Sequence, residues 1–342
     1  MSVDCSSDLL TPATDAPTVS IVIINWNGQE HLARCLASLE AQTYRDFEII
    51  VVDNGSTDGS VGFIRERYPA VRLIRNERNM GFARANNQGI AMARGRYIAI
   101  LNNDTQAEPP WLETLVSAAE AHPEMGAFAP LVLFNDRRDT IDSAGLTVLI
   151  WGYGVQNRLG EHRARAGSIC EVFGVTATAA LFRRELLLDI GLFDEDYFIY
   201  YEDVDLAWRA RLRGWRALFV PEAIVYHTHS ATVGRNSPFK RRLLTRNRLW
   251  TIVKNYHFPA FLFFLPLIVI LQIGSVVLSL VRGDTAPLTG LWQGLMGLPG
   301  ALRKRAIVQS RRTASFREMV SWMGWFQSPF PTWRLRWALG RL

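Results

Sequence analysis

The stretch Val19-Ser20-Ile21-Val22-Ile23-Ile24 decides the fold that this sequence predicts. It is a short apolar run, rich in β-branched residues, which is typical of a strand buried on both faces of a parallel sheet. The residues Asn25-Trp26-Asn27-Gly28 break this strand, and a helical pattern of apolar residues follows as far as Leu39. The order strand, turn, helix is the repeating unit of an α/β domain.

The same unit recurs further along the chain. Apolar runs that predict strands alternate with stretches that have a helical pattern. The predicted strands are residues 47–52, 71–74, 97–101, 177–183, 216–220 and 223–226, and the predicted helices are residues 82–92, 184–190 and 203–213. This alternation favours an α/β fold, a mostly parallel sheet flanked by helices.

Polar clusters directly follow three of the predicted strands. They are Asn25-Trp26-Asn27, Asp53-Asn54-Gly55-Ser56 and Asn102-Asn103-Asp104. Ordinary turns also favour Asn, Asp and Gly, so one such cluster alone would mean little. Ligands of parallel sheets bind at the carboxyl ends of the strands, and three clusters at one edge therefore indicate a binding site.

The segment 191–205 places Glu202 and Asp203 among aromatic side chains, including Phe198 and Tyr201. Carboxylates walled by aromatic residues suit a general base, because partial desolvation raises the pKa toward the working range. The alternative is that the two acids merely open the helix that follows, where negative charge suits the positive end of the helix dipole.

Seven blocks of the sequence resemble, in order, the family 2 glycosyltransferases of the GT-A fold, in their bacterial rhamnosyltransferase-like branch. No single block is specific to this family, but seven blocks in the order in which the family has them make a specific match. The blocks are residues 20–28, Asp53-Asn54-Gly55-Ser56-Thr57-Asp58, residues 79–87, Leu101-Asn102-Asn103-Asp104-Thr105, Gly191-Leu192-Phe193-Asp194-Glu195, Tyr201-Glu202-Asp203-Val204-Asp205-Leu206 and His227-Thr228-His229-Ser230. They imply a GT-A (Rossmann-like) catalytic domain over residues 18–250.

The resemblance implies a role for each matching position. Asp53 would hydrogen-bond the base of a nucleotide sugar, and Asp203, with Glu202 beside it, would be the catalytic base. Asn102-Asn103-Asp104 stands where the family has Asp-x-Asp, so only Asp104 keeps its carboxylate. The implied nucleotide-sugar-binding residues are Asn25, Asn27, Asp53, Asn54, Gly81, Asn86, Asn102, Asn103 and Asp104.

A divalent cation is expected at Asp104 and His227, where it would neutralise the charge of a leaving nucleoside diphosphate. A carboxylate with an imidazole suits Mn²⁺, whereas Mg²⁺ would favour oxygen ligands. Two assignments stay open: Glu202 in place of Asp203 as the base, and His229 in place of His227 as the ligand. Either histidine could also be a satisfied polar residue at a strand end.

Composition narrows the remaining classes of protein. A chain of 342 residues with 49% hydrophobic content excludes wholesale disorder and allows one large domain with an appendage, or two domains. Residues 1–17 are rich in Ser, Thr, Asp and Pro and predict a disordered leader rather than a signal peptide. The three cysteines form no CxxC pair, so neither a zinc site nor a disulfide framework is indicated. No GxxxxGK(S/T) motif occurs, and no GxGxxG follows a strand.

Basic residues are concentrated near the C-terminus, although the formal net charge of the whole chain is only +6. Residues 301–342 carry a single acid, Glu318, against nine basic residues. These are Arg303, Lys304, Arg305, Arg311, Arg312, Arg317, Arg334, Arg336 and Arg341. Such a tail indicates an anionic partner there, rather than a general nucleic-acid-binding surface.

Residues 258–281 contain no charged side chain and exceed the roughly 20 residues that a membrane-spanning helix needs. Pro259 and Pro266 are expected to confine the helix to residues 267–281. Basic residues flank the segment on both sides, so a single span would leave one basic flank outside, against the positive-inside tendency. We therefore expect an in-plane or re-entrant hairpin with residues 286–300 as its return arm. A soluble dimerisation helix is the alternative.

The composition of the C-terminal region supports its binding to a membrane surface. Its tryptophans suit the headgroup level, and its basic residues would bind anionic lipid. These tryptophans are Trp292, Trp322, Trp325, Trp333 and Trp337. Residues 251–342 are thus predicted to be a membrane-associated hairpin and basic tail, with contact through residues 258–342 at the cytoplasmic face of the plasma (inner) membrane.

Together these features predict an inverting glycosyltransferase that moves a sugar from a nucleoside-diphosphate sugar to a hydroxyl, with rhamnose suggested by the resemblance. The expected acceptor is a polyprenyl-linked saccharide or an oligosaccharide in cell-surface polysaccharide synthesis. One alternative is a nucleotide-sugar-binding or scaffold protein of the same fold that lacks turnover. Another is a membrane protein whose soluble part only organises partners.

Overall fold

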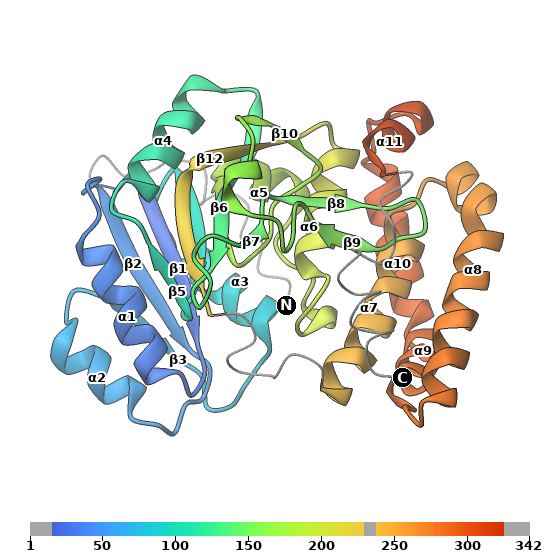
Figure 1. Cartoon of the computed structure of the whole chain (residues 1–342), viewed down its shortest axis with the longest axis horizontal. Coiled ribbons are helices and arrows are strands. Elements are labelled where there is room, and N and C mark those ends of the chain that lie inside the picture. The colour runs from blue at the N-terminus through green and yellow to red at the C-terminus, as the bar shows by residue number, and fades with distance from the viewer. Residues whose placement is uncertain (1–15, 229–236, 325–342) are drawn as a thin grey trace, which may run out of the picture.

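The computed structural model describes residues 16–228 and 237–324, and Figure 1 shows how they are arranged. A ten-stranded sheet has the main order β3-β2-β1-β4-β11-β6-β12-β10, with β5 paired to β12 and β7 paired to β6. A separate two-stranded sheet consists of β8 and β9. The strands are β1 (Val19–Asn25), β2 (Phe47–Asp53), β3 (Arg72–Arg75), β4 (Tyr97–Asn102), β5 (Thr105–Ala107), β6 (Met125–Phe134), β7 (Ile141–Ser143), β8 (Leu146–Val148), β9 (Gly154–Gln156), β10 (Cys170–Val172), β11 (Ala179–Arg183) and β12 (Arg216–His227).

Helices connect and cover these strands. Two short 3₁₀ helices, η1 (Arg163–Arg165) and η2 (Glu195–Tyr197), lie in the connections. The α-helices are α1 (Gln29–Glu40), α2 (Ser60–Arg67), α3 (Phe82–Met92), α4 (Trp111–Ala121), α5 (Arg184–Ile190), α6 (Glu202–Leu212), α7 (Pro238–Asn255), α8 (Phe258–Val281), α9 (Ala286–Met296), α10 (Leu298–Ser310) and α11 (Phe316–Trp322).

The predicted α/β fold, with a mostly parallel sheet flanked by helices, is confirmed. The strands β1 to β4, β6 and β12 all point the same way, because β11 runs antiparallel to both β4 and β6 and so restores the direction. The carboxyl ends of β1, β2, β4, β6 and β12 therefore lie at one edge of the sheet. Any site built on strand ends must form there.

Two apolar layers cover the sheet. On one face, residues such as Ile21 and Ile23 of β1 pack with Leu36 of α1 and Trp111 of α4. On the other, Val22 packs with residues of α3, α5 and α6. Alternate residues of β1 thus enter opposite layers, which is why the strand is apolar nearly throughout.

A third apolar cluster joins the C-terminal helices to α6 rather than to the sheet. Trp208 of α6 is fully buried and contacts Tyr256, which directly follows α7, with ring centroids 5.3 Å apart. Phe264 of α8 and Met319 of α11 belong to the same cluster. In Figure 1, α8 forms the outer edge of the molecule, on the side away from β1 to β3. Residue 250 lies within α7, so this helix crosses the predicted boundary between residues 18–250 and 251–342.

The strand β6 was not predicted, although it is central and all ten of its residues are buried. Its sequence includes Gly126 and Pro130, residues that weaken a strand prediction. Pro130 is tolerated because it pairs with Val220 next to an irregularity in the β6–β12 register, between Val220 and Ile224. The same irregularity explains why the predicted strands 216–220 and 223–226 are one strand, β12.

The prediction that proline confines the apolar helix to residues 267–281 is wrong. The helix α8 runs from Phe258 to Val281 and contains Pro266. Pro259 lies in the first turn, where an amide hydrogen has no helical partner in any case. The predicted return arm, residues 286–300, is also revised, because it spans all of α9 and the beginning of α10.

Some predictions concern residues outside the described ranges. They are the first fifteen residues of the predicted leader, His229, the arginines Arg334, Arg336 and Arg341 of the basic tail, and the tryptophans Trp325, Trp333 and Trp337. The alternative of His229 as a ligand therefore stays a prediction.

Candidate active site

The three polar clusters meet at the carboxyl edge of the sheet. Asn25 pairs with Asp53 in the β1–β2 ladder, and Ile24 pairs with Asn102 in the β1–β4 ladder. Asn25 Nδ2 donates to Asp53 Oδ1 at 3.2 Å, and Asn103 Nδ2 donates to Asn25 Oδ1 at 2.8 Å. One buried network thus links residues from all three clusters.

The connections after β1 and β2 close one side of this edge. Asn27 has a positive φ of 47°, and its Oδ1 accepts a hydrogen bond from Thr57 N at 2.8 Å. Ser56 Oγ accepts hydrogen bonds from Asn27 N at 2.9 Å and from Asn25 Nδ2 at 3.2 Å. Asp53 is buried, while Asn27 remains exposed at the rim.

Asn54 and Gly81 close the other side. Asn54 Nδ2 donates to Gly81 O at 3.3 Å, and Asn54 Oδ1 accepts from Met80 N at 2.9 Å. Gly81 has a φ of 86°, and a Cβ there would lie 2.5 Å from the ring of Phe198, so only glycine fits. Asn86 is different: it is fully buried in α3, and its Nδ2 donates to Phe82 O of the same helix. Among the described residues, no hydrogen bond joins Asn86 to the Asp53 network.

Asp104 and His227 face each other beyond the end of β4. Asp104 Oδ1 lies 3.4 Å from His227 Nε2, and Thr228 N donates to Asp104 O at 2.9 Å. His227 Nδ1 lies 2.6 Å from Asp142 Oδ2. The imidazole therefore lies between two carboxylates, of which Asp142 was not identified from the sequence. Nothing in its surrounding polar stretch distinguishes it.

This arrangement favours positive charge at the imidazole. Burial lowers the pKa of His227, but the hydrogen bonds and negative charge of Asp104 and Asp142 outweigh it and raise the pKa to about 10. Asp104 Oδ1 is buried and accepts no well-formed hydrogen bond from the described residues. A carboxylate oxygen facing an imidazole nitrogen fits a divalent cation when the imidazole is neutral, so a cation bound here would take the place of the proton on Nε2.

The cation would need further ligands from elsewhere. Within residues 16–228 and 237–324, no group of three or more His, Cys, Asp or Glu side chains forms a ready-made metal site. Two protein ligands leave positions for diphosphate oxygens and water, which is how Mg²⁺ is commonly held with nucleotides.

Asp203 lies close to the end of β4. Asp203 Oδ2 accepts a hydrogen bond from Ala177 N at 3.4 Å, and the adjacent Thr178 O accepts from Asn102 N at 2.9 Å. Asp203 Oδ1 also accepts from Val204 N at 2.8 Å in the first turn of α6. Asp203 is thus connected to Asn102, at the end of β4, by two hydrogen bonds through the adjacent residues Ala177 and Thr178.

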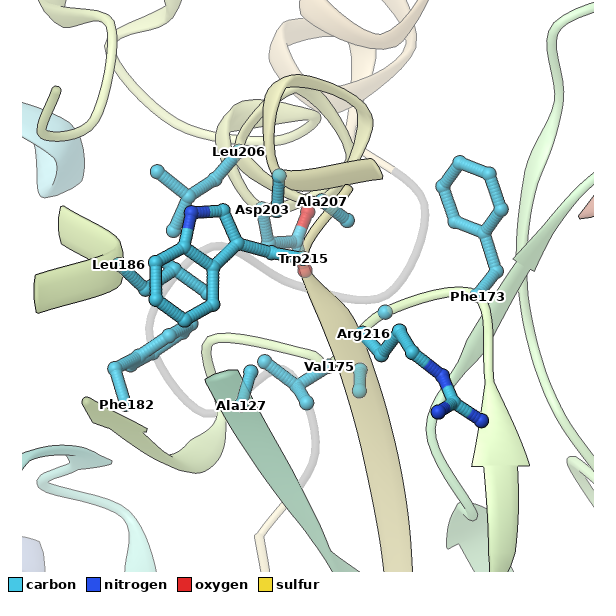
Figure 2. A pocket seen from close by; sticks show the side chains of 13 residues that line it. Ala127, Phe173, Val175, Phe182, Leu186, Asp203, Leu206, Ala207, Trp215 and Arg216 are labelled. Atoms are coloured by element: carbon cyan, nitrogen blue, oxygen red, sulfur yellow. The ribbon is translucent and has the colours of Figure 1, made fainter. Parts of the chain in front are cut away.

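The surroundings of Asp203 are largely apolar. It lines an enclosed cavity of about 20 Å³ together with Leu186, Leu206 and Trp215, as Figure 2 shows. The cavity has room for no more than about one water molecule, so it is not a sugar site. Burial raises the pKa of Asp203, although backbone hydrogen bonds from Val204 and Ala177 oppose the shift.

Glu202 is more deeply buried than Asp203. Glu202 Oε2 has no hydrogen-bond partner among the described residues. Burial, and then the negative charge of Asp203, raise the pKa of Glu202 well above its usual range. Because the charged form of Glu202 is disfavoured more strongly, Asp203 is the better candidate for the base.

The turn before these acids is strained. Phe198, Tyr200 and Tyr201 all have positive φ, between 66° and 70°. Bulky residues in this region cost about 1–3 kcal/mol each and persist only where the surrounding structure imposes them, often at functional sites. Asn247 of α7, which the sequence did not single out, contacts this turn.

Comparisons with known proteins identify the family of this chain. Residues 20–191 match the family description "Glycosyl transferase family 2". The N-acetylglucosaminyl-diphospho-decaprenol L-rhamnosyltransferase of Mycobacterium tuberculosis is 33% identical over 239 residues, which are 63% of this chain and 78% of that protein.

Two solved structures share the fold. The structure of GalNAc-T7 with UDP, GalNAc and Mn²⁺ has a TM-score of 0.57 at 20% identity and covers 71% of this chain and 48% of its own. A mannosyltransferase from Pyrobaculum calidifontis, in complex with GDP-Man and Mn²⁺, has a TM-score of 0.50 at 20% identity and covers 90% of this chain and 79% of its own.

The fold and the polar strand ends define a GT-A enzyme that transfers a sugar from a nucleotide sugar. This chain belongs to glycosyltransferase family 2.

Proposed function

We propose that this enzyme inverts the anomeric centre of its donor, with Asp203 as the base. The observation that carries the proposal is the place of Asp203: hydrogen bonds through Ala177 and Thr178 connect it to Asn102 at the end of β4, and burial raises its pKa. In a single displacement, the acceptor oxygen bonds to the anomeric carbon while the bond to the diphosphate oxygen breaks. Asp203 takes the proton of the acceptor hydroxyl.

The remaining site residues have binding roles in this proposal. Asp53 would accept a hydrogen bond from the nucleotide base, and the amides of Asn25, Asn27 and Asn103 would line the nucleotide. Asp104 and His227 would hold a divalent cation, Mn²⁺ or Mg²⁺, which would neutralise charge on the diphosphate. Asp142 would hold His227 Nδ1–H, so that Nε2 faces Asp104.

Asp142→Asn is expected to weaken the binding of Mn²⁺ about 10–100-fold, because an uncharged amide orients and polarises His227 less well. Calorimetric titration of Mn²⁺ in the presence of nucleoside diphosphate measures this directly, without turnover. Asp139→Asn, a substitution of an exposed carboxylate in the same polar stretch, is the control. Equal Mn²⁺ affinity of Asp142→Asn and wild type would contradict the proposed role.

We further propose rhamnose as the sugar and a polyprenyl-diphosphate-linked saccharide as the acceptor. The support is the mycobacterial relative, whose name specifies rhamnosyl transfer to a decaprenyl-diphosphate-linked sugar. An acceptor of this kind lies in a bilayer, so an enzyme that uses it gains from residing at the membrane surface. The Kd for the rhamnose donor tests the assignment of the sugar. The KM for a polyprenyl-diphosphate-linked saccharide tests the assignment of the acceptor.

The helix α8 supports a membrane location. It is long and apolar enough to cross a membrane, and only 17% of its most apolar window is buried in the protein. Large exposed apolar side chains cover it and continue onto α9. They are Phe258, Leu262, Phe263, Leu267, Val269, Ile270, Ile273, Val277, Leu278, Leu280, Val281, Leu288, Trp292, Leu295 and Met296. Exposed Arg282 directly follows α8 and suits an anionic leaflet. We propose that this surface binds the cytoplasmic leaflet of the plasma (inner) membrane.

The double variant Phe263→Glu/Ile270→Glu is expected to bind phosphatidylglycerol vesicles at least about 100-fold less tightly, since it removes two fully inserted side chains. Vesicle co-sedimentation measures the change. Met92→Glu, which alters an exposed apolar residue of α3, is the matched control. If α8 is instead a dimerisation helix, the double variant changes the mass measured by light scattering and leaves vesicle binding unchanged.

The decisive test of the proposed function is nucleoside diphosphate release. Purified enzyme in vesicles is incubated with a panel of nucleotide sugars and Mn²⁺, with and without a polyprenyl-diphosphate-linked acceptor. Acceptor-dependent release from dTDP-rhamnose is expected, and the product should have inverted configuration. Binding of the donor without any release would favour the scaffold alternative.

A further inference from the structure

The turn that leads into Glu202 and Asp203 has a conformation that its own residues disfavour. Phe198, Tyr200 and Tyr201 have φ angles of 66°, 70° and 70°. Side chains with a Cβ rarely enter this left-handed region, and aromatic residues do so only where neighbouring structure imposes it. Contacts from outside the turn must therefore hold it in place.

Asn247 of α7 supplies those contacts. Its Nδ2 lies 3.0 Å from Tyr197 O, 3.0 Å from Ile199 O and 2.7 Å from Tyr200 O, so its two N–H groups are shared among three carbonyls. Asn247 is fully buried, and its Oδ1 accepts a hydrogen bond from Arg246 Nε at 2.8 Å. This last bond fixes which end of the amide faces the turn, so the donating group points at the three carbonyls.

The other side of the turn rests on α3. Phe198 O accepts hydrogen bonds from Phe82 N at 2.6 Å and Ala83 N at 3.2 Å, and the ring of Phe198 lies against Gly81. The turn therefore joins the beginning of α3, on the nucleotide side, to the beginning of α6, where the carboxylates are. A shift of the turn would move both.

We infer that Asn247 is a positioning residue for catalysis: by holding the carbonyls of Tyr197, Ile199 and Tyr200, it fixes the direction in which Asp203 leaves the turn. This inference rests on the proposed function. Among the described residues, no hydrogen bond joins the Asn247 side chain to Asp203 or to the Asp53 network, so it acts through the backbone of the turn. It also means that the C-terminal helices complete the active site.

Asn247→Ala is expected to lower turnover about 10²-fold, because small displacements of a catalytic group have effects of this size. The KM for the donor should change less than about threefold, since the Asp53 network is untouched. Hydrogen exchange of the backbone amides of residues 198–201, measured without substrate, should become faster. Asn247→Asp keeps the shape but loses the donors, so it should lose turnover to the same extent.

The control is Asn255→Ala, in the same helix. Asn255 is also fully buried, but its Nδ2 donates to Asp205 Oδ1 at 2.8 Å and Thr251 O at 3.1 Å rather than to the turn. It should lose stability and keep turnover per folded molecule. A second variant, Tyr200→Gly in the Asn247→Ala background, should recover part of the lost turnover, because glycine adopts positive φ without strain.

The outcomes separate the two proposals. Wild-type enzyme that releases no nucleoside diphosphate from any donor would overturn the proposed function and this inference with it. If wild type is active, three results would overturn the inference alone. Asn247→Ala could be as active as wild type, or its hydrogen exchange in residues 198–201 could be unchanged. Asn247→Ala and Asn255→Ala could also lose turnover equally.

Discussion

Asp203→Asn is expected to lower acceptor-dependent release of nucleoside diphosphate by about 10²–10⁴-fold, the range that a positioned general base contributes. The amide has nearly the same shape and its single oxygen can still accept from Val204 N, but its NH2 group cannot accept from Ala177 N or take a proton. The Kd for the donor should stay within about threefold of the wild-type value, because binding and proton transfer use different residues. Calorimetry for binding and a coupled assay for release measure the two effects separately.

Glu202→Gln is the matched comparison for this prediction. Glu202 is buried with its pKa raised well above the usual range, so its charged form is already disfavoured. Its amide variant should therefore retain most of the turnover. The reverse pattern, with Glu202→Gln inactive and Asp203→Asn active, would assign the base to Glu202 and contradict the mechanism proposed above.

The second large effect is expected for Lys254→Met, which should lower the free energy of unfolding by about 3–5 kcal/mol. Lys254 Nζ lies 2.6 Å from both Asp194 Oδ2 and Asp205 Oδ1, and the lysine side chain is only 3% exposed. Methionine fills the same volume but leaves the two buried carboxylates with less compensating charge. Urea unfolding followed by circular dichroism measures the loss.

Arg84→Met is the control for the lysine variant. Arg84 Nε lies 3.7 Å from Glu195 Oε2, and both side chains are about half exposed. A solvated pair of this kind contributes about 0–1 kcal/mol. Similar losses for the two variants would show that burial of the Lys254 pair has no special effect on stability.

The stability that Lys254 provides should depend on pH. Burial alone would raise the pKa of Asp205, but Lys254 and Arg209 outweigh it and lower the pKa to about 2. A carboxyl group whose pKa is depressed on folding stabilises the fold above its unfolded pKa, near 4, and loses that contribution as the pH falls through about 2. The difference between wild type and Lys254→Met should therefore be constant above pH 5 and shrink between about pH 4 and 2.

The sequence predicted the carboxyl edge of the sheet well, because each polar cluster directly follows a strand whose pattern is unambiguous. It predicted β6 poorly. Pro130 and Gly126 disfavour a strand locally, and only pairing on both sides, with β11 and β12, compensates for them. Pro266 led to the wrong prediction that the apolar helix begins at residue 267. A single missing hydrogen bond does not end a helix when the residues on both sides of the proline favour helix.

By itself, the sequence determined the α/β fold, the enzyme family, and the identities of Asp53, Asp104, Asp203 and His227 as candidates. Those features are local, because each rests on a motif or on the order of apolar runs. Only the tertiary structure showed that Asp142 faces His227 and that Asn247 holds the turn before Glu202. Both contacts join residues that are far apart in the chain, by 85 and 50 positions. Such pairings depend on how the helices and strands pack, for which no local pattern of residues exists.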